Sequence, residues 1–220
     1  MKAMVLAAGR GERMGTLTAN RPKPLLEIDG VSLIERHLQK LAACGVEEIV
    51  VNLSYRGAQI REGLGDGRRF RLAIRYSDEG EPPLETAGGI VRALPLLGAS
   101  PFLLVNADVF TDFDFGTLLS DQRSSLVLVP NPAHNARGDF GSDESGLVRA
   151  APPLSTYGGI AVLEPKLFAG LADGRRPLKP VLDAAIARRE LRAVHYPGLW
   201  VDVGTPERLD DARRLAAARS

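Results

Sequence analysis

The sequence predicts an α/β fold with a mixed, mainly parallel β-sheet and helices on both faces of the sheet. Two observations support this prediction. Short apolar runs of strand length alternate along the 220 residues with stretches whose apolar residues recur at helical spacing. A small, glycine-rich segment also follows the first apolar run directly, as is typical of a loop at the carboxyl edge of a parallel sheet.

The expected elements follow one another in this alternating order. Residues 2–7 and 48–53 are predicted strands, and residues 32–43 between them form an amphipathic helix that Gly45 ends. No linker or internal repeat interrupts the chain, so residues 1–220 are expected to form a single domain. The remaining strands are expected at residues 72–76, 101–106, 126–129, 147–148 and 159–163, and the remaining helices at 58–63, 87–94, 178–188 and 206–218.

Composition limits the possible partners. The 28 Lys and Arg residues nearly balance 27 Asp and Glu, and the formal net charge of +1 argues against a nucleic-acid partner. No apolar run is long enough to span a membrane and Met1 begins the first strand directly, so we expect a cytoplasmic protein. Cys44 is the only cysteine and is expected to be a packing thiol. The composition leaves a monomer and a homodimer equally open.

The segment after the first strand has the composition of an anion-binding loop. Backbone N–H groups beside glycines can approach an anion closely because no side chain obstructs them. Arg10, Arg13 and Lys23 add positive charge at the same end of the strand, as a triphosphate and its pyrophosphate product require. The segment comprises Leu6, Ala7, Ala8, Gly9, Arg10, Gly11, Glu12, Arg13 and Met14.

Two common phosphate-binding motifs are excluded. A P-loop needs Lys-Ser/Thr directly after its second glycine, and Gly15 is followed by neither. A dinucleotide fingerprint needs a third glycine where Met14 stands, and an acidic residue ends its next strand, where Asn52 stands.

The loop and the residues after it resemble the signature of the sugar-1-phosphate nucleotidyltransferases. That signature reads Leu-Ala-Ala-Gly-x-Gly-x-Arg-Met/Leu, a spacer with Thr, and then Arg/Lys-Pro-Lys-Pro. Residues 6–14, Thr18 and residues 21–24 match it, and the resemblance extends over nearly the whole chain. It implies a Rossmann-like, GT-A-like nucleotidyltransferase fold. It also implies an enzyme that transfers a nucleoside monophosphate to a sugar 1-phosphate and releases pyrophosphate.

The resemblance assigns two distant carboxylates as Mg²⁺ ligands. Asp108 follows the strand at 101–106, and Asp202 lies in the segment Trp-Val-Asp-Val-Gly-Thr-Pro, which resembles a second family motif. Hard Mg²⁺ prefers few carboxylates, with phosphate oxygens and water completing its shell. Asp112 and Asp114 are interpreted as a solvated turn, with contact to the metal's waters left open. The expected catalytic residues are Arg13, Lys23, Asp108 and Asp202.

The base-binding turn is expected at residues 82–89, which resemble Leu-Gly-Thr-Ala-Gly of the family with Glu85 in place of the first Gly. Glu79 or Glu81 stands about where relatives carry Gln, and a carboxylate, which only accepts hydrogen bonds, suits the N3–H of uracil or thymine. A charged surface loop is the alternative. The expected nucleotide-binding residues are Leu6, Ala7, Ala8, Gly9, Arg10, Gly11, Arg13, Lys23, Glu81, Thr86, Ala87, Gly88 and Asn106.

The sugar side departs from the family pattern. Residues 150–155 lack the Glu-Lys-Pro that in many relatives holds the sugar and its phosphate, so Arg176, Lys179 or Lys166 is expected to supply the cation. Tyr157 replaces the Asn of a family segment Asn-x-Gly-Ile. The expected sugar-binding residues are Gly138, Tyr157, Gly159 and Lys179.

The short chain and its truncated sugar loop most resemble the uridylyltransferases that act on N-acetylmuramate 1-phosphate. That resemblance implies UTP as donor, UDP-N-acetylmuramate as product and a role in peptidoglycan recycling for the cell wall. Two alternatives remain open at this point. One is a mannose- or heptose-1-phosphate guanylyltransferase, and the other is a nucleotide-sugar-sensing module without catalysis.

Overall fold

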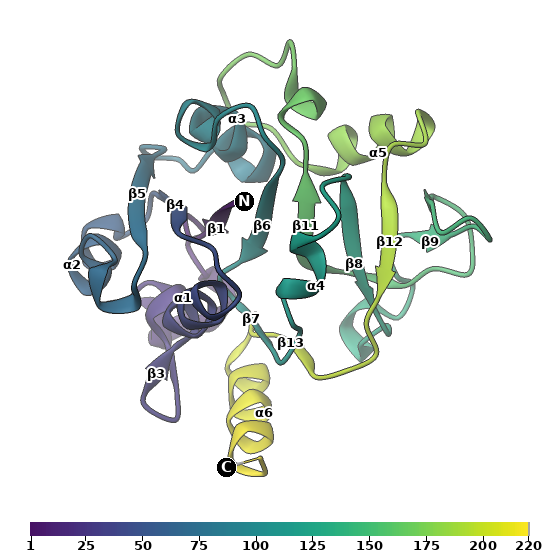
Figure 1. The fold of residues 1–220 in the computed structure, drawn as a ribbon. Coiled ribbons are helices and arrows are strands. Elements are labelled where there is room, and N and C mark those ends of the chain that lie inside the picture. The colour runs from purple at the N-terminus through teal and green to yellow at the C-terminus, as the bar shows by residue number, and fades with distance from the viewer. Residues whose placement is uncertain (220) are drawn as a thin grey trace.

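The computed structural model describes residues 1–219, and a seven-stranded sheet forms its centre (Figure 1). The strands of this sheet are β1 (Lys2–Leu6), β4 (Glu48–Leu53), β5 (Ala73–Asp78), β6 (Phe102–Asn106), β8 (Ser125–Val129), β11 (Thr156–Leu163) and β12 (Arg192–His195). They lie side by side in the order β12-β8-β11-β6-β1-β4-β5. Only β11 is antiparallel to its neighbours. The predicted mixed, mainly parallel sheet is confirmed.

Helices cover both faces of the sheet, as the alternation of the sequence predicted. The side chains of β1 alternate between two buried clusters: Ala3 and Val5 pack with α1 and α2, whereas Met4 packs with α3 and α5. The α-helices are α1 (Leu33–Ala43), α2 (Gly57–Leu64), α3 (Glu85–Leu97), α4 (Gly116–Leu119), α5 (Lys179–Ala187) and α6 (Pro206–Ala217).

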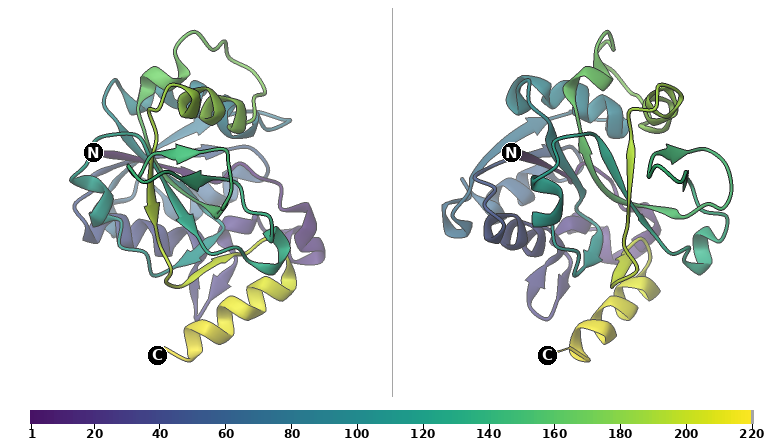
Figure 2. Two further views of the ribbon diagram at one scale, coloured as in Figure 1. Left: turned by 90° about the vertical axis from the view of Figure 1, so that its right-hand side faces the viewer. Right: turned by 45° about the vertical axis from the view of Figure 1, so that its right-hand side comes forward.

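Side-chain caps begin two of these helices. Ser32 caps α1: its hydroxyl accepts from the Glu35 N–H at 3.3 Å, and the Glu35 carboxylate accepts in return from the Ser32 N–H. Thr205 caps α6, whose first residue is Pro206. This helix projects away from the sheet and ends at the C-terminus (Figure 2).

Three two-stranded pairs lie outside the central sheet. They are β2 (Glu27–Ile28) with β3 (Val31–Ser32), β7 (Val109–Thr111) with β13 (Trp200–Asp202), and β9 (Gly141–Ser142) with β10 (Val148–Arg149). The sequence pattern predicted neither β7 nor β13, nor the edge strand β12. Such strands of three or four residues carry too little pattern to be recognised, because their pairing partners are distant in the chain.

Two further expectations concern membrane spans and the single cysteine. No helix within residues 1–219 is long and apolar enough to cross a membrane. Cys44 is half-buried against the core and its thiol donates to the carbonyl of Leu41 at 3.2 Å, which agrees with a packing role.

Candidate active site

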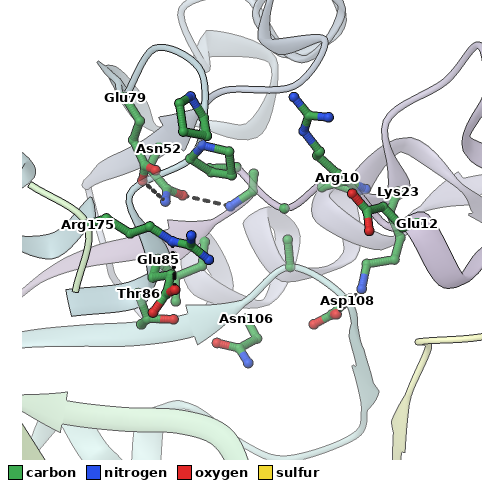
Figure 3. A pocket seen from close by; sticks show the side chains of 18 residues that line it. Arg10, Glu12, Lys23, Asn52, Glu79, Glu85, Thr86, Asn106, Asp108 and Arg175 are labelled. Atoms are coloured by element: carbon green, nitrogen blue, oxygen red, sulfur yellow. Dashed lines mark hydrogen bonds and ion pairs between the residues drawn. The ribbon is translucent and has the colours of Figure 1, made fainter. Parts of the chain in front are cut away.

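The carboxyl ends of β1, β4 and β6 open onto a cavity of about 610 Å³, here called the donor cavity (Figure 3). Leu6 and Asn106 end β1 and β6, Asn52 is the residue before the last of β4, and the sheet register places Asn52 and Asn106 on either side of Leu6. The cavity is lined by Leu6, Ala7, Ala8, Gly9, Arg10, Glu12, Lys23, Pro24, Asn52, Glu79, Pro82, Pro83, Glu85, Thr86, Asn106, Ala107, Asp108 and Arg175.

A buried hydrogen-bond chain fixes one wall of the donor cavity. The side-chain oxygen of Asn52 accepts from the backbone N–H of Ala7 at 2.7 Å, and its amide donates to Glu79 Oε1 at 2.6 Å. The other carboxylate oxygen of Glu79 accepts from the Leu84 N–H at 2.7 Å. Asn52 and Glu79 are only 3% and 5% exposed. The start of the glycine-rich loop is therefore tied to the segment that precedes α3.

The opposite end of the donor cavity carries two cations, Lys23 and Arg10. Lys23 forms an ion pair with Asp108, and these side chains are 13% and 24% exposed. Figure 3 shows Arg10 and Glu12 beside Lys23, away from Asn52 and Glu79. The cavity thus has a charged end at Lys23, and a second side, near Asn52, on which Arg175 and Glu85 form an ion pair.

Only part of the predicted base-binding turn lines the donor cavity. Of the three residues expected to read the base, Thr86 lines the cavity, but the N–H groups of Ala87 and Gly88 both donate to the carbonyl of Arg176, at 3.0 and 3.2 Å. A Cβ on Gly88 would lie 2.3 Å from the Gly174 carbonyl oxygen, so glycine is required there for packing. The two amides are already engaged within the protein and do not face a ligand.

Of the two carboxylates proposed near the base, Glu79 and not Glu81 lines the cavity. Glu81 is exposed and pairs with Arg10 at 3.1 Å. Gly11 also lies outside the lining: its carbonyl accepts from Met14 N–H, and a Cβ at its φ of 65° would crowd Lys23. Gly11 therefore determines the conformation of the loop, whereas Gly9 and Arg10 line the donor cavity directly.

A second cavity of about 390 Å³, here called the acceptor cavity, adjoins the first and shares Asn106 and Asp108 with it. Antiparallel pairing of β13 with β7 sets Asp202 opposite Val109, so the two predicted metal-ligand carboxylates lie on one cavity. The lining comprises Arg13, Asn106, Asp108, Val109, His134, Asn135, Asp139, Thr156, Tyr157, Gly158, Gly159, Trp200 and Asp202.

Asp202 is compensated by a cation just as Asp108 is. Arg208 Nη1 donates to Asp202 Oδ2 at 2.7 Å and lies 2.7 Å from His134 Nε2. Burial and the charge of Arg208 lower the pKa of His134, so it acts as a neutral acceptor for Arg208 near neutral pH. Arg208 stands in the first turn of α6, six residues after Asp202, a spacing that sequence reasoning could have used.

The structure brings two of the four predicted sugar-binding residues to the acceptor cavity. Tyr157 and Gly159 line it at an irregularity in β11. Gly159 has a φ of 70°, and a Cβ there would lie 2.7 Å from the Asn106 amide. Gly138 and Lys179 do not line the acceptor cavity: the Gly138 N–H donates to the Asn135 carbonyl, and Lys179 pairs with Asp183 on its own helix at 2.7 Å.

The other side chains expected to supply a cation to the sugar phosphate, Lys166 and Arg176, also lie outside the acceptor cavity. Lys166 pairs with Glu164 at 3.0 Å, and Arg176 donates to the Ala172 carbonyl at 2.9 Å. Arg13, predicted to face the pyrophosphate, lines the acceptor cavity, and no ion-pair partner for it occurs within residues 1–219. Arg13 is thus a cation of the acceptor cavity itself, and Arg208 adjoins this cavity through its ion pair with Asp202.

The acidic turn after β7 plays a local role. Asp112 accepts hydrogen bonds from the Tyr196 hydroxyl and the Leu199 N–H, and Asp114 accepts from the Gly116 N–H at 2.9 Å. Neither lines the donor or the acceptor cavity. Their interpretation as a turn agrees with these contacts.

A larger outer groove of about 780 Å³ continues from the acceptor cavity toward α6. The two share Arg13, His134, Trp200 and Asp202. The remaining lining residues are Pro132, Ala133, Val201, Thr205, Arg208, Asp211, Arg214 and Leu215. An acceptor with a bulky or acidic substituent would therefore find space beyond the cavity itself.

Asp108 and Asp202 form an oxygen-only donor pair, which fits a hard divalent cation whose shell is completed by phosphate oxygens and water. Lys23 and Arg208 balance their charges. No group of three His, Cys, Asp or Glu side chains within residues 1–219 is arranged to hold a metal ion.

The chain is similar in sequence to a known protein family and to proteins of known description. The family model described as nucleotidyl transferase matches residues 2–141. An N-acetylmuramate alpha-1-phosphate uridylyltransferase from Neisseria meningitidis serogroup B is 45% identical over 99% of this chain and 99% of its own. A protein of the same description from Caulobacter vibrioides is 35% identical over 98% of this chain and 97% of its own.

More distant relatives share the fold. A mannose-1-phosphate guanylyltransferase from Mycobacterium tuberculosis is 32% identical over 93% of this chain, which spans 61% of that protein. Among solved structures, a UDP-glucose pyrophosphorylase in complex with UDP-glucose superimposes with a TM-score of 0.81 at 18% identity, over 100% of this chain and 99% of that one. At this identity the likeness concerns the fold.

Proposed function

The chain belongs to the nucleotidyl transferase family, and from this premise we propose that it transfers UMP from UTP to N-acetylmuramate 1-phosphate. The products are UDP-N-acetylmuramate and pyrophosphate. The observation that carries the proposal is the junction at Asn106 and Asp108, where a donor cavity and an acceptor cavity meet. The predicted cytoplasmic location and the role in cell-wall recycling belong to the same proposal.

The reaction needs positioning and charge neutralisation more than covalent chemistry. A sugar-phosphate oxygen attacks the α-phosphorus of UTP in line, the new P–O bond forms, and the bond to the pyrophosphate oxygen breaks. Lys23 and Arg10 lie at the charged end of the donor cavity, where they neutralise the pyrophosphate that leaves. Arg13 binds the sugar phosphate in the acceptor cavity, and Arg208 holds Asp202 in place beside it.

Mg²⁺ is the cofactor in this proposal, and Asp108 and Asp202 would hold it. When bound, it supplies Lewis-acid neutralisation of phosphate oxygens. Lys23 and Arg208 form ion pairs with these two carboxylates and balance their charges.

Two features favour N-acetylmuramate as the sugar. The near-full-length relatives carry that substrate in their descriptions. The outer groove beyond the acceptor cavity offers room and the guanidinium groups of Arg208 and Arg214 for the lactyl carboxylate, which glucose and N-acetylglucosamine lack.

The test is pyrophosphate release with Mg²⁺, crossing UTP, dTTP, GTP and CTP with N-acetylmuramate, N-acetylglucosamine, glucose and mannose 1-phosphates. The proposal expects activity with UTP and N-acetylmuramate 1-phosphate to exceed every other pair. Preference for GTP with mannose 1-phosphate would overturn it in favour of a guanylyltransferase. Nucleotide binding without pyrophosphate release from any pair would instead indicate a sensing module.

A further inference from the structure

A short loop, residues 172–176, closes one side of the donor cavity and is fixed to the start of α3. The Arg176 N–H donates to the Leu84 carbonyl at 2.8 Å, and the Arg176 carbonyl accepts from Ala87 and Gly88. Arg92 of α3 pairs with Asp173 at 2.5 Å. Because backbone and side-chain contacts both hold the loop, the residue at its centre, Arg175, has a defined position.

Arg175 lines the donor cavity and pairs with Glu85. Arg175 Nε lies 2.8 Å from Glu85 Oε1, and within residues 1–219 its two Nη groups have no protein partner. A guanidinium held at Nε alone keeps its planar face and both terminal donor groups available to a ligand.

Stability does not account for Glu85. Its φ of 61° lies in the left-handed region, where a side chain is strained. The partner Arg175 is 68% exposed, and an ion pair that open to water contributes little to folding. Strain without a compensating gain in stability is typical of residues that serve a binding site.

The position of Arg175 distinguishes its role from that of the other cations. Figure 3 shows Arg175 and Glu85 near Thr86 and Asn52, on the side of the cavity away from Lys23 and Asp108. A donor whose triphosphate lies at Lys23 and Arg10 would place its base and ribose at this opposite side.

We infer that Arg175, oriented by Glu85, binds the nucleoside half of the donor, where its guanidinium packs against the base and its Nη groups donate to base or ribose oxygens. This inference rests on the proposed function, since it takes the donor cavity to hold a nucleoside triphosphate. Arg175 contacts the ligand in this account, and Glu85 is a positioning residue that acts through it.

Calorimetric titration of UTP, UMP and pyrophosphate at fixed Mg²⁺ tests the inference. Arg175→Ala is expected to raise the Kd of UTP and of UMP by the same factor, about 5- to 20-fold, and to leave the Kd of pyrophosphate within twofold. Arg175→Lys restores neither, because a lysine lacks the planar group. Arg68→Ala removes an exposed arginine that does not line the cavity, and this matched control keeps the wild-type Kd values.

Two outcomes would overturn the inference. Weaker pyrophosphate binding by Arg175→Ala, matching its loss for UTP, would assign Arg175 to the triphosphate. Unchanged binding of all three ligands would remove Arg175 from the site.

Glu85→Gly separates positioning from stability. It removes the carboxylate and the strain together, so we expect a Kd for UTP about 3- to 10-fold higher and a melting temperature equal to or above that of the wild type. Glu85→Gln keeps a side-chain acceptor for Nε and recovers most of the affinity. Wild-type affinity in Glu85→Gly would refute the positioning role. A wrong nucleotide in the proposed function shows itself separately, as tighter binding of GTP than UTP by the unmodified chain.

Discussion

The donor and acceptor cavities are adjacent halves of one site but are built in different ways. The donor cavity draws most of its charged end from one continuous stretch, residues 6–24, whose backbone is fixed by the buried Asn52 and Glu79 side chains. The acceptor cavity is assembled from side chains of distant segments, which ion pairs such as that of Arg208 with Asp202 hold in place. A binding site made by a local backbone motif can be recognised in a sequence, whereas one made by distant side chains needs the fold.

The largest effect is expected at the residue that the two halves share. Asp108→Asn keeps the shape of the side chain but removes its charge, and we expect kcat to fall by about 10³-fold or more, with an unchanged circular dichroism spectrum. Asp114→Asn, in the acidic turn outside both cavities, is the control and should stay within about threefold of wild type. Substantial activity in Asp108→Asn would mean that the halves do not meet at this carboxylate.

Lys23→Ala tests the donor half alone. Loss of the charge that faces the pyrophosphate is expected to lower kcat/KM for UTP by about 10²- to 10³-fold, with Lys23→Arg recovering part of it. The KM for the sugar 1-phosphate should change far less, because Lys23 does not line the acceptor cavity. Steady-state kinetics with each substrate varied in turn decides the point; an equal rise in both KM values would contradict the division into halves.

Acid is expected to destabilise α1, the helix whose Lys40 supports β7 beside the site. Burial, with a smaller effect of the Lys40 charge, lowers the pKa of His37 on α1 to about 4. The unfolded chain therefore binds this proton more readily, so the contribution of His37 is complete above pH 6.5 and is lost as the pH falls toward 4. The loss amounts to about 3 kcal/mol. Lys40 of the same helix donates to the Thr111 carbonyl of β7, which pairs with β13.

Urea unfolding between pH 7 and 4.5 measures this effect. His37→Leu should flatten the part of the pH dependence that His37 causes, at some cost in packing. A pH profile identical in wild type and variant would contradict the assignment.

The smallest effect is expected in the outer groove. Arg214 is exposed and already paired with Asp211, so Arg214→Ala should raise the KM for N-acetylmuramate 1-phosphate only about two- to fivefold. Any activity with N-acetylglucosamine 1-phosphate should be unchanged, because that sugar lacks the lactyl carboxylate. Arg213→Ala, next to it on α6 but outside the groove, is the matched control; equal effects of the two variants would exclude a specific contact.

The same division explains what could be predicted from the sequence. The helix at Leu33–Ala43 and the strand at Glu48–Leu53 carry strong periodicity and were predicted to within one residue. Asp108 and Asp202 were expected on one site, and the structure brings them to one cavity. Their meeting depends on strand pairing between β7 and β13, which the chain pattern alone does not specify.

The expected site residues that lie outside the two cavities share one physical feature: other parts of the protein engage them. Ala87 and Gly88 were expected to read the base, but their amides bind the carbonyl of Arg176, a residue almost 90 positions away. Lys179 was expected near the sugar, but an aspartate one helical turn along its own helix engages it. Hydrogen-bond competition of this kind is decided by tertiary contacts, so neither the turn motif nor the excess of surface cations could predict it.

The central claim is that donor and acceptor meet directly at Asp108, with no covalent intermediate on the protein. Exchange of labelled pyrophosphate into UTP tests it most directly. The account predicts no exchange when the protein is incubated with Mg²⁺ and UTP alone, and exchange once N-acetylmuramate 1-phosphate is added. Exchange with UTP alone would show that a residue of the chain accepts the uridylyl group, and would contradict the account.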